Sequence, residues 1–275
     1  MLGEGAFGAV FRGMWRGTAV AVKDFRTPVI DANITKDVMH EIALLERLRS
    51  PYIVTFYGFY CNQFFSLHIH TGMVMNSKRN CIVMELAPMG SLASVLTKHD
   101  LSFRLKLRIA LDCAKGMMFL HCNHVLHRDL KTDNLLVMSL DLESPQRIKI
   151  TDFGTSRMIT DEAARSYTHT VGTPIYTSPE ILNNEPYSEK ADVFSFGILL
   201  WSLYTQKVPY QDEFKNNFAI IKHVLNAGRP RLPALLPASY ENVMARAWEH
   251  QQGHRPSFTE IVTMLELADN EANEE

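Results

Sequence analysis

The first part of the chain has the short hydrophobic period of β-strands. Between residues 8 and 25, in GAVFRGMWRGTAVAVKDF, β-branched and aromatic residues are interrupted by two glycines, which predicts strands joined by turns. Strand-like IVTFYGFY and CIVMEL follow at 53–60 and 81–86. Before them, TKDVMHEIALLERLR at 35–49 repeats apolar residues every three or four positions, which predicts one amphipathic helix.

Beyond Pro88 the hydrophobic period becomes helical. Pro88 and Gly90 interrupt both periodicities, which places a boundary near 87/88. The predicted helical segments of the second part are 103–121, 190–205, 239–250 and 257–268. The chain is therefore expected to be α+β, with a small antiparallel-sheet lobe carrying one key helix (1–87) and a larger, mainly helical lobe (88–268). The acidic end DNEANEE (269–275) is expected to be a disordered tail.

Composition excludes several classes of protein. The 275 residues are 46% hydrophobic and 21% charged, which is ordinary for a globular chain, and the net charge of −2 gives no support for a nucleic-acid partner. The most apolar run, VFSFGILLWSLY at 193–204, is shorter than the roughly 20 residues that span a bilayer. We expect no membrane segment in this chain, although the abrupt start leaves room for a longer, membrane-anchored parent.

The four cysteines stand at positions 61, 81, 113 and 122 and match no zinc-binding spacing. They are interpreted as free thiols in a reducing compartment. The expected location is therefore cytoplasmic.

A glycine-rich loop opens the chain. GEGAFG at 3–8 fits G-x-G-x-x-G, but a dinucleotide site needs a helix after the glycines, and strand-like AVFRGMW follows here. The loop is therefore expected to join two strands, with glycines that let backbone N–H groups approach phosphate oxygens. Lys23 ends the next apolar strand, AVAVK. It is either a snorkelling surface lysine or a cation held near phosphates by a carboxylate such as Glu41.

A polar run, HVLHRDLKTDN at 124–134, stands between apolar MMFL and LLV. Taken by itself, this polar run would fit an exposed turn. Downstream, IKITDFG places Asp152 after an apolar strand, and Asp152 and Asn134 both offer the hard oxygen ligands that Mg²⁺ prefers. Asp129 is placed to accept or orient the proton of an attacking hydroxyl, and Lys131 to offset charge on a phosphoryl group. Together these residues predict phosphoryl transfer, which needs alignment and charge compensation.

The ordered set of motifs resembles the eukaryotic protein kinases over essentially the whole chain. The matching motifs are GEGAFGAV, AVAVK, a helix bearing Glu41, HRDLKTDN, DFG and SPE. The resemblance implies a two-lobed protein kinase fold over 1–268, with ATP and Mg²⁺ as cofactors and proteins as substrates.

The resemblance also implies roles for individual positions. The catalytic residues would be Asp129, Lys131, Lys23 and Glu41, with Asp129 as the base. The metal ligands would be Asn134 and Asp152. The ATP-binding residues would be Leu2, Gly3, Glu4, Gly5, Ala6, Phe7, Gly8, Val10, Ala21, Lys23, Glu85, Ala87 and Leu136. Met84 would lie behind the adenine. Taken singly, the apolar members would equally fit plain core positions.

Three structural relationships follow from the same resemblance. Glu180 would form an ion pair with Arg255, and Asp192 would brace the catalytic loop. An apolar column joining the lobes would consist of Leu45, Phe56, His127 and Phe153. His127 is thus expected to pack and to form hydrogen bonds, without taking part in proton transfer.

The motifs also bear on the subgroup. Lys131 and the segment GTPIYTSPE, with Thr173, resemble serine/threonine kinases, whereas ADVFSFGILLW and HRPSF resemble the tyrosine-kinase side. That mixture is similar to the tyrosine-kinase-like group, and implies a serine/threonine kinase acting in signalling. The alternatives are a dual-specificity kinase that also acts on tyrosine, a pseudokinase serving as a scaffold or switch, and a small-molecule kinase. The presence of Lys23, Asp129 and Asp152 argues against a pseudokinase, and GTPIYTSPE against a small-molecule kinase.

Control is expected at Arg128, which precedes the predicted base. In the family this arginine often binds a phosphate on the activation segment, here 155–173; otherwise it only braces the loop. The hydroxyl-bearing candidates are Ser166, Tyr167, Thr168 and Thr170. An upstream kinase or autophosphorylation in trans would supply the phosphate. The long segment at 61–80 is either a docking surface or a tolerated insertion.

Overall fold

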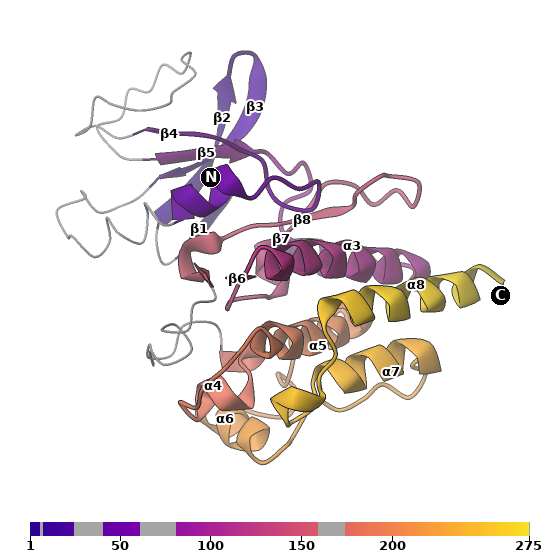
Figure 1. Cartoon of the computed structure of the whole chain (residues 1–275). Coiled ribbons are helices and arrows are strands. Elements are labelled where there is room, and N and C mark those ends of the chain that lie inside the picture. The colour runs from indigo at the N-terminus through magenta and orange to yellow at the C-terminus, as the bar shows by residue number, and fades with distance from the viewer. Residues whose placement is uncertain (6–7, 25–40, 61–80, 159–173, 275) are drawn as a thin grey trace.

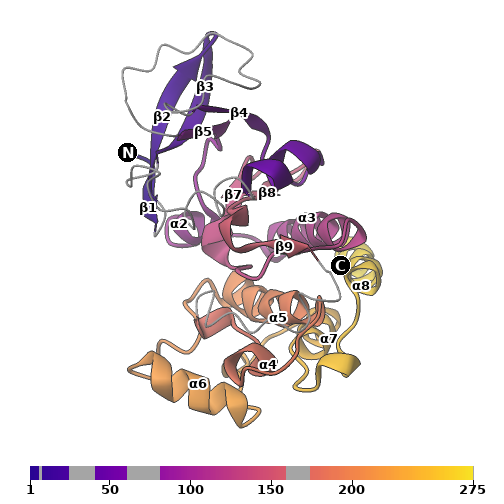
Figure 2. The same cartoon turned by 60° about the vertical axis from the view of Figure 1, so that its left-hand side comes forward.

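The computed structural model describes residues 1–5, 8–24, 41–60, 81–158 and 174–274. The β-sheet lies at one end of the molecule and the long helices at the other, as both views show (Figures 1 and 2). This arrangement confirms the expected α+β, two-lobed architecture. The predicted boundary near 87/88 falls in the connection between the last strand of the sheet, which ends at Glu85, and the first helix after it, which begins at Leu92.

The N-terminal lobe is built on one five-stranded antiparallel sheet with the order β1-β2-β3-β5-β4. Its strands are β1 (Gly3–Gly5), β2 (Gly8–Trp15), β3 (Thr18–Asp24), β4 (Phe56–Tyr60) and β5 (Cys81–Glu85). Trp15 pairs with Thr18, so only Arg16 and Gly17 form the turn between β2 and β3. Both have positive φ, 49° and 80°, as a two-residue hairpin that follows the strand twist requires.

The two faces of this sheet bury different residues. Val20, Val22, Cys81 and Val83 form a small cluster of their own. The alternate residues Ile82 and Met84 belong to the main core, together with apolar residues of a helix over 41–47. The predicted helix at 35–49 can be compared only over its second half, because 25–40 lie outside the described residues. The insertion at 61–80 also lies outside them.

The C-terminal lobe is mainly helical. Its helices are α2 (Leu92–Leu96), α3 (Phe103–Cys122), α4 (Pro179–Leu182), α5 (Lys190–Thr205), α6 (Asn217–Leu225), α7 (Ala238–Ala247) and α8 (Phe258–Glu274). Every residue of α5 from Ala191 to Leu203 is buried, in keeping with its apolar sequence. A Cβ added at Gly197 would lie 2.8 Å from both the backbone nitrogen and Cβ of Trp248, so only glycine fits this helix crossing.

Short strands and 3₁₀ turns lie between the helices of the C-terminal part. They are β6 (Val125–Leu126), η1 (Thr132–Asn134), β7 (Leu135–Val137), β8 (Ile148–Ile150), η2 (Phe153–Thr155), β9 (Arg157–Met158), η4 (Pro174–Tyr176) and η5 (Gln252–His254). β6 pairs with β9, and β7 with β8. Ile150 donates its N–H to the Tyr52 carbonyl and accepts from the Val54 N–H, so the segment before β4 is hydrogen-bonded to β8.

The expected disordered tail at 269–275 is wrong for 269–274, because α8 continues to Glu274. Leu265, Ala268 and Asp269 lie on one buried face of this helix. The Asp269 carboxylate is 2.7 Å from the guanidinium of Arg108 on α3. The acidic composition suggested disorder, but this segment belongs to a helix that is paired with α3, far away in the sequence.

The loop from 138 to 147, before β8, is attached to α3. The buried Arg147 donates its backbone N–H to the Asp112 carboxylate at 2.6 Å. Its guanidinium donates to the Leu142 carbonyl, within the same loop. This loop is therefore fixed at its second end.

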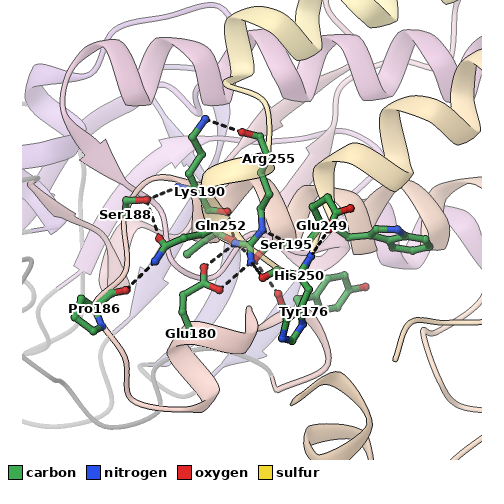
Figure 3. A network of polar contacts seen from close by, with 12 residues as sticks. Tyr176, Glu180, Pro186, Ser188, Lys190, Ser195, Glu249, His250, Gln252 and Arg255 are labelled. Carbon is green, nitrogen blue, oxygen red and sulfur yellow. Dashed lines mark hydrogen bonds and ion pairs between the residues drawn. The ribbon is translucent and has the colours of Figure 1, made fainter. Parts of the chain in front are cut away.

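The predicted ion pair between Glu180 and Arg255 is confirmed and lies at the centre of a polar network (Figure 3). Two nitrogens of Arg255 donate to the two carboxylate oxygens of Glu180 at 2.6 and 2.9 Å. The remaining N–H groups donate to the carbonyls of Glu249, His250 and Lys190. All five donors of a guanidinium that is fully buried therefore have acceptors.

Within the described ranges, no helix has both the length and the apolar character needed to cross a membrane. Cys81, Cys113 and Cys122 are free thiols. Cys61 lies outside the described residues.

Candidate active site

Lys23 and Glu41 meet inside the N-terminal lobe, as the sequence predicted. Lys23 is the penultimate residue of β3, and its ammonium group lies 2.8 and 3.1 Å from the two oxygens of Glu41. Both residues are buried. Burial alone would lower the pKa of Lys23, but the carboxylates of Glu41 and Asp152 more than offset it and raise the pKa. Lys23 is therefore a fixed cation.

Asp152 brings a second carboxylate to the same ammonium group. It stands two residues after β8, and its Oδ1 is 3.2 Å from Nζ of Lys23. Its φ of 65° is in the left-handed region, which is unusual for a residue other than glycine. Burial acts to raise the pKa of Asp152, but the charge and hydrogen bond of Lys23 lower it overall. The carboxylate thus stays ionised.

The predicted base lies in a short hydrogen-bonded turn. Asp129 accepts from Nζ of Lys131 at 2.7 Å and from the side-chain amide of Asn134 at 3.1 Å. The same amide donates to the Asp129 backbone carbonyl at 2.7 Å. Lys131 and Asn134 therefore fix both the side chain and the backbone of Asp129.

The two predicted metal ligands are neighbours in the fold. The Asn134 backbone carbonyl accepts the N–H of Thr151, the residue before Asp152, at 3.0 Å. Because the amide nitrogen of Asn134 is used to donate to Asp129, its amide oxygen is the group suited to a cation. An ionised carboxylate and an amide oxygen are hard ligands of the kind that Mg²⁺ prefers, so these residues fit the ion.

Asp192 braces the catalytic loop from α5. Its carboxylate accepts the backbone N–H groups of His127 and Arg128 at 2.9 and 2.8 Å. It also lies 2.9 Å from Nε2 of His121, a partner that the sequence did not reveal. Three donors around one buried carboxylate hold the backbone immediately before Asp129.

His127 packs and forms hydrogen bonds, as expected. Its ring lies 5.5 Å from that of Phe153 between centroids, and its Nε2 is 3.0 Å from the Thr151 carbonyl. Nδ1 accepts the N–H of Asp129 at 3.3 Å. Leu45 belongs to the same core as Phe153, and Phe56 packs against it. Because both ring nitrogens of His127 have partners, the ring is occupied by structural contacts.

The predicted nucleotide end lies along β1, β2, β3 and β5. Gly5 pairs with Gly8 and Gly3 with Val10, so β1 and β2 are antiparallel neighbours, and Ala6 and Phe7 lie outside the described residues. Leu2 donates its N–H to the Val10 carbonyl and is half exposed.

The expected adenine residues belong to adjacent segments. Ala21 is paired with Met84 across β3 and β5, and both are buried. Leu136 is bridged to Ser91, just after the connection that carries Glu85 and Ala87. The structure thus places Ala21 and Met84 on neighbouring strands and Leu136 beside the segment that follows Ala87, while their role in binding ATP stays a prediction. The side chain of Glu4 is not among the described ones.

The side chain of Glu85 has a role that the sequence did not suggest. Its carboxylate accepts from Nζ of Lys149 at 2.6 Å and from the Thr55 hydroxyl at 2.7 Å. Burial acts to raise the pKa of Glu85, but these hydrogen bonds lower it overall. The sequence held one sign of this contact. Lys149 lies between two isoleucines in the apolar strand IKI, where a lysine needs a partner of opposite charge.

Arg128, the predicted phosphate receptor, points its guanidinium at two acceptors from different elements. Nε donates to the Thr155 carbonyl at 2.5 Å, and Nη1 donates to the Tyr187 hydroxyl at 3.3 Å. The candidate phosphorylation residues Ser166, Tyr167, Thr168 and Thr170 lie outside the described residues. Their part in control stays a prediction.

Comparison with known proteins agrees with this geometry. A family model described as protein tyrosine and serine/threonine kinase matches residues 1–265. The chain is 37% identical over 269 residues to the probable serine/threonine-protein kinase drkD of Dictyostelium discoideum, covering 96% of this chain and 19% of that protein. It is 36% identical over 266 residues to the dual specificity protein kinase shkB of the same organism, covering 94% and 38%.

The chain is also similar to a plant kinase over its whole length. The chain is 32% identical over 277 residues to the serine/threonine-protein kinase STY46 of Arabidopsis thaliana, covering 100% of this chain and 44% of that protein. The chain therefore spans between about a fifth and less than half of the length of these relatives.

Proposed function

The chain belongs to the protein tyrosine and serine/threonine kinase family, and on that premise we propose that it transfers the γ-phosphoryl group of ATP to serine and threonine hydroxyls of protein substrates. The observation that carries the proposal is the joint placement of Lys23, Glu41 and Asp152 in one ion cluster. Asp129 lies in the adjoining loop, paired with Lys131. This combination supplies a phosphate-binding cation, a carboxylate for a metal and a carboxylate for a hydroxyl.

In the reaction, the substrate oxygen attacks the γ-phosphorus while the bond to the β-phosphate oxygen breaks and ADP leaves. Asp129 orients the hydroxyl and accepts its proton, and Lys131 offsets the negative charge on the transferring group. Lys23 contacts the α and β phosphates and is kept in place by Glu41. The loop needs little rearrangement, because Asp192 and Asn134 already hold its backbone.

Asn134 and Asp152 are the residues that would hold Mg²⁺. The ion would neutralise the charge on the phosphate oxygens when it is bound. The low pKa of Asp152 supports this assignment, since a ligand carboxylate has to be ionised.

A peptide array incubated with Mg²⁺ and ATP tests activity and residue preference together. We expect phosphate on serine and threonine peptides and none from the Asp129→Asn protein. Phosphate on tyrosine peptides as well would indicate dual specificity, as the name of shkB gives for that relative. No transfer to any peptide by the folded protein, with or without phosphate on its own activation segment, would favour the pseudokinase.

The same proposal includes control by phosphorylation within Ser166 to Thr170, with Arg128 as the receptor. A phosphoryl group adds about −1.5 to −2 charge and three strong acceptors, which a guanidinium binds in bidentate fashion. The phosphate would come from an upstream kinase or from a second copy of this protein. Phosphatase treatment should lower activity, and substitution of all four hydroxyl residues should abolish the difference. We propose the cytoplasm as the compartment, because ATP and reduced thiols are both found there.

A further inference from the structure

Tyr187 and Arg128 are separated by 59 positions in the sequence, yet their side chains are hydrogen-bonded. Tyr187 lies in the loop between α4 and α5 and is half-buried. Its hydroxyl oxygen is 3.3 Å from Nη1 of Arg128, while the Thr155 carbonyl accepts from Nε of the same guanidinium at 2.5 Å. The arginine is therefore held between the start of the activation segment and a loop of the helical lobe.

The loop that carries Tyr187 is fixed on both sides of the tyrosine by a single residue, Gln252. The Gln252 side-chain amide donates to the Pro186 carbonyl at 3.1 Å, and its oxygen accepts from the Ser188 hydroxyl at 3.1 Å (Figure 3). The Ser188 hydroxyl also accepts the backbone N–H of Lys190 at 3.3 Å. Tyr187 thus projects from a loop with little freedom to move.

The anchor itself lies next to the polar network around Arg255. Gln252 begins η5, which ends directly before Arg255, the buried partner of Glu180. Nζ of Lys190 donates to the Arg255 carbonyl at 2.8 Å (Figure 3). Through Gln252, the loop that carries Tyr187 is consequently attached beside the contacts that hold Glu180 in α4.

We propose that Tyr187 is a positioning residue for Arg128: its hydroxyl holds the guanidinium ready to receive the phosphate of the activation segment. The proposal rests on the phosphate-dependent control proposed above. An arginine has several rotatable bonds, so ordering it costs conformational entropy at the moment of binding. A guanidinium that is already fixed in the unphosphorylated protein avoids that cost, and its planar fork then meets the phosphate oxygens in one orientation.

The test compares wild type with Tyr187→Phe, which keeps the ring and removes only the hydroxyl. For each protein, kcat/KM towards a serine peptide is measured after phosphorylation and after phosphatase treatment, and the ratio of the two values is the activation ratio. We expect this ratio to fall about fivefold or more in Tyr187→Phe, in line with loss of one hydrogen bond to a charged group. The activity of the phosphatase-treated enzyme and its melting temperature should match wild type.

The matched control is Tyr204→Phe, which removes the hydroxyl that donates to the Leu235 carbonyl. Its activation ratio should equal that of wild type. An equal fall in both variants would mean that losing any such hydroxyl impairs the protein, and would overturn the proposal.

Action through Arg128 is tested by a double-mutant cycle. In the Arg128→Gln background, or in Arg128→Lys if the first variant does not fold, Tyr187→Phe should produce no further fall in the activation ratio. A fall of the same size with and without Arg128 would overturn the positioning role. If phosphorylation activates wild type and Tyr187→Phe equally, Tyr187 has no such role. If wild type itself is not activated, the proposed control fails first, and the proposal for Tyr187 fails with it.

Discussion

The ammonium group of Lys23 lies 2.8 and 3.1 Å from the two carboxylate oxygens of Glu41. Glu41 is 3% exposed and Lys23 is 9% exposed, so both charges have lost most of their water. Such desolvation is costly, and Asp152 contributes a second carboxylate 3.2 Å from the same ammonium group. These three charges connect β3, the helix over 41–47 and the segment after β8.

Glu41→Gln removes the negative charge from this cluster at nearly constant shape. We expect kcat/KM for ATP to fall about 10- to 100-fold, because hydrogen bonds to charged groups contribute about 1.5–3 kcal/mol. Steady-state kinetics with varied ATP measures the change. The control is Glu266→Gln, since the ion pair of Glu266 with Lys115 is half exposed to solvent. Similar losses in the two variants would contradict a specific role for Glu41.

Asp129→Asn should preserve folding and ATP affinity while kcat falls by about 10²- to 10⁴-fold, the range for loss of a general base. The asparagine can still accept from Lys131, but it cannot take up the proton of the substrate hydroxyl. Calorimetry with ATP and phosphate transfer to a peptide separate the two effects. Asp133→Asn, the same change at an exposed position of the same loop, should leave both unchanged. Wild-type turnover in Asp129→Asn would remove Asp129 from the mechanism.

Asp152→Ala should weaken nucleotide binding more in the presence of Mg²⁺ than in its absence. A carboxylate that reaches the phosphates through a metal contributes only when the metal is bound. The measurement is calorimetric titration of ATP with and without Mg²⁺. Equal losses in the two conditions would show that Asp152 acts on Lys23 alone.

Arg255→Met should be strongly destabilising, by about 3–5 kcal/mol, because it leaves the Glu180 carboxylate buried without its cation. Urea unfolding measures the change. The double variant Arg255→Met with Glu180→Met should recover much of the loss, since both charges are then absent. A double variant less stable than Arg255→Met would contradict the electrostatic explanation.

The stability of the protein should depend on pH through Asp192. Burial acts to raise the pKa of this carboxyl, but the hydrogen bond and charge of His121, followed by contributions from His127, lower it overall. Because the folded pKa lies below the unfolded value of about 3.9, Asp192 stabilises the fold above that pH, and this stability is lost as the pH falls through the folded pKa. The stability difference between wild type and Asp192→Asn should therefore shrink below about pH 4. A difference that stays constant down to pH 2 would refute this.

The sequence by itself determined the helices that arise from a local pattern of hydrophobic residues. The helical period predicted α3 and α5 nearly to their ends, and the order of short motifs predicted which residues would lie near one another. The pairing of Lys23 with Glu41 and of Glu180 with Arg255 was implied by the resemblance to the protein kinases that this ordered set of motifs carries. The helix predictions succeed because hydrophobic periodicity is a property of neighbouring residues in the chain, whereas the two ion pairs join distant positions and could be predicted only through the family resemblance.

Only the tertiary structure decided the contacts between residues that lie far apart in the chain, because the residues next to them in the sequence form no pattern that identifies the partner. The segment 269–274 continues α8, and its Asp269 pairs with Arg108, on a helix that begins more than 150 positions earlier. Tyr187 reaches Arg128 because Gln252, in yet another segment, fixes its loop. A side chain finds its partner through proximity in space, and that proximity is created by the packing of whole helices and loops, which no short stretch of sequence contains.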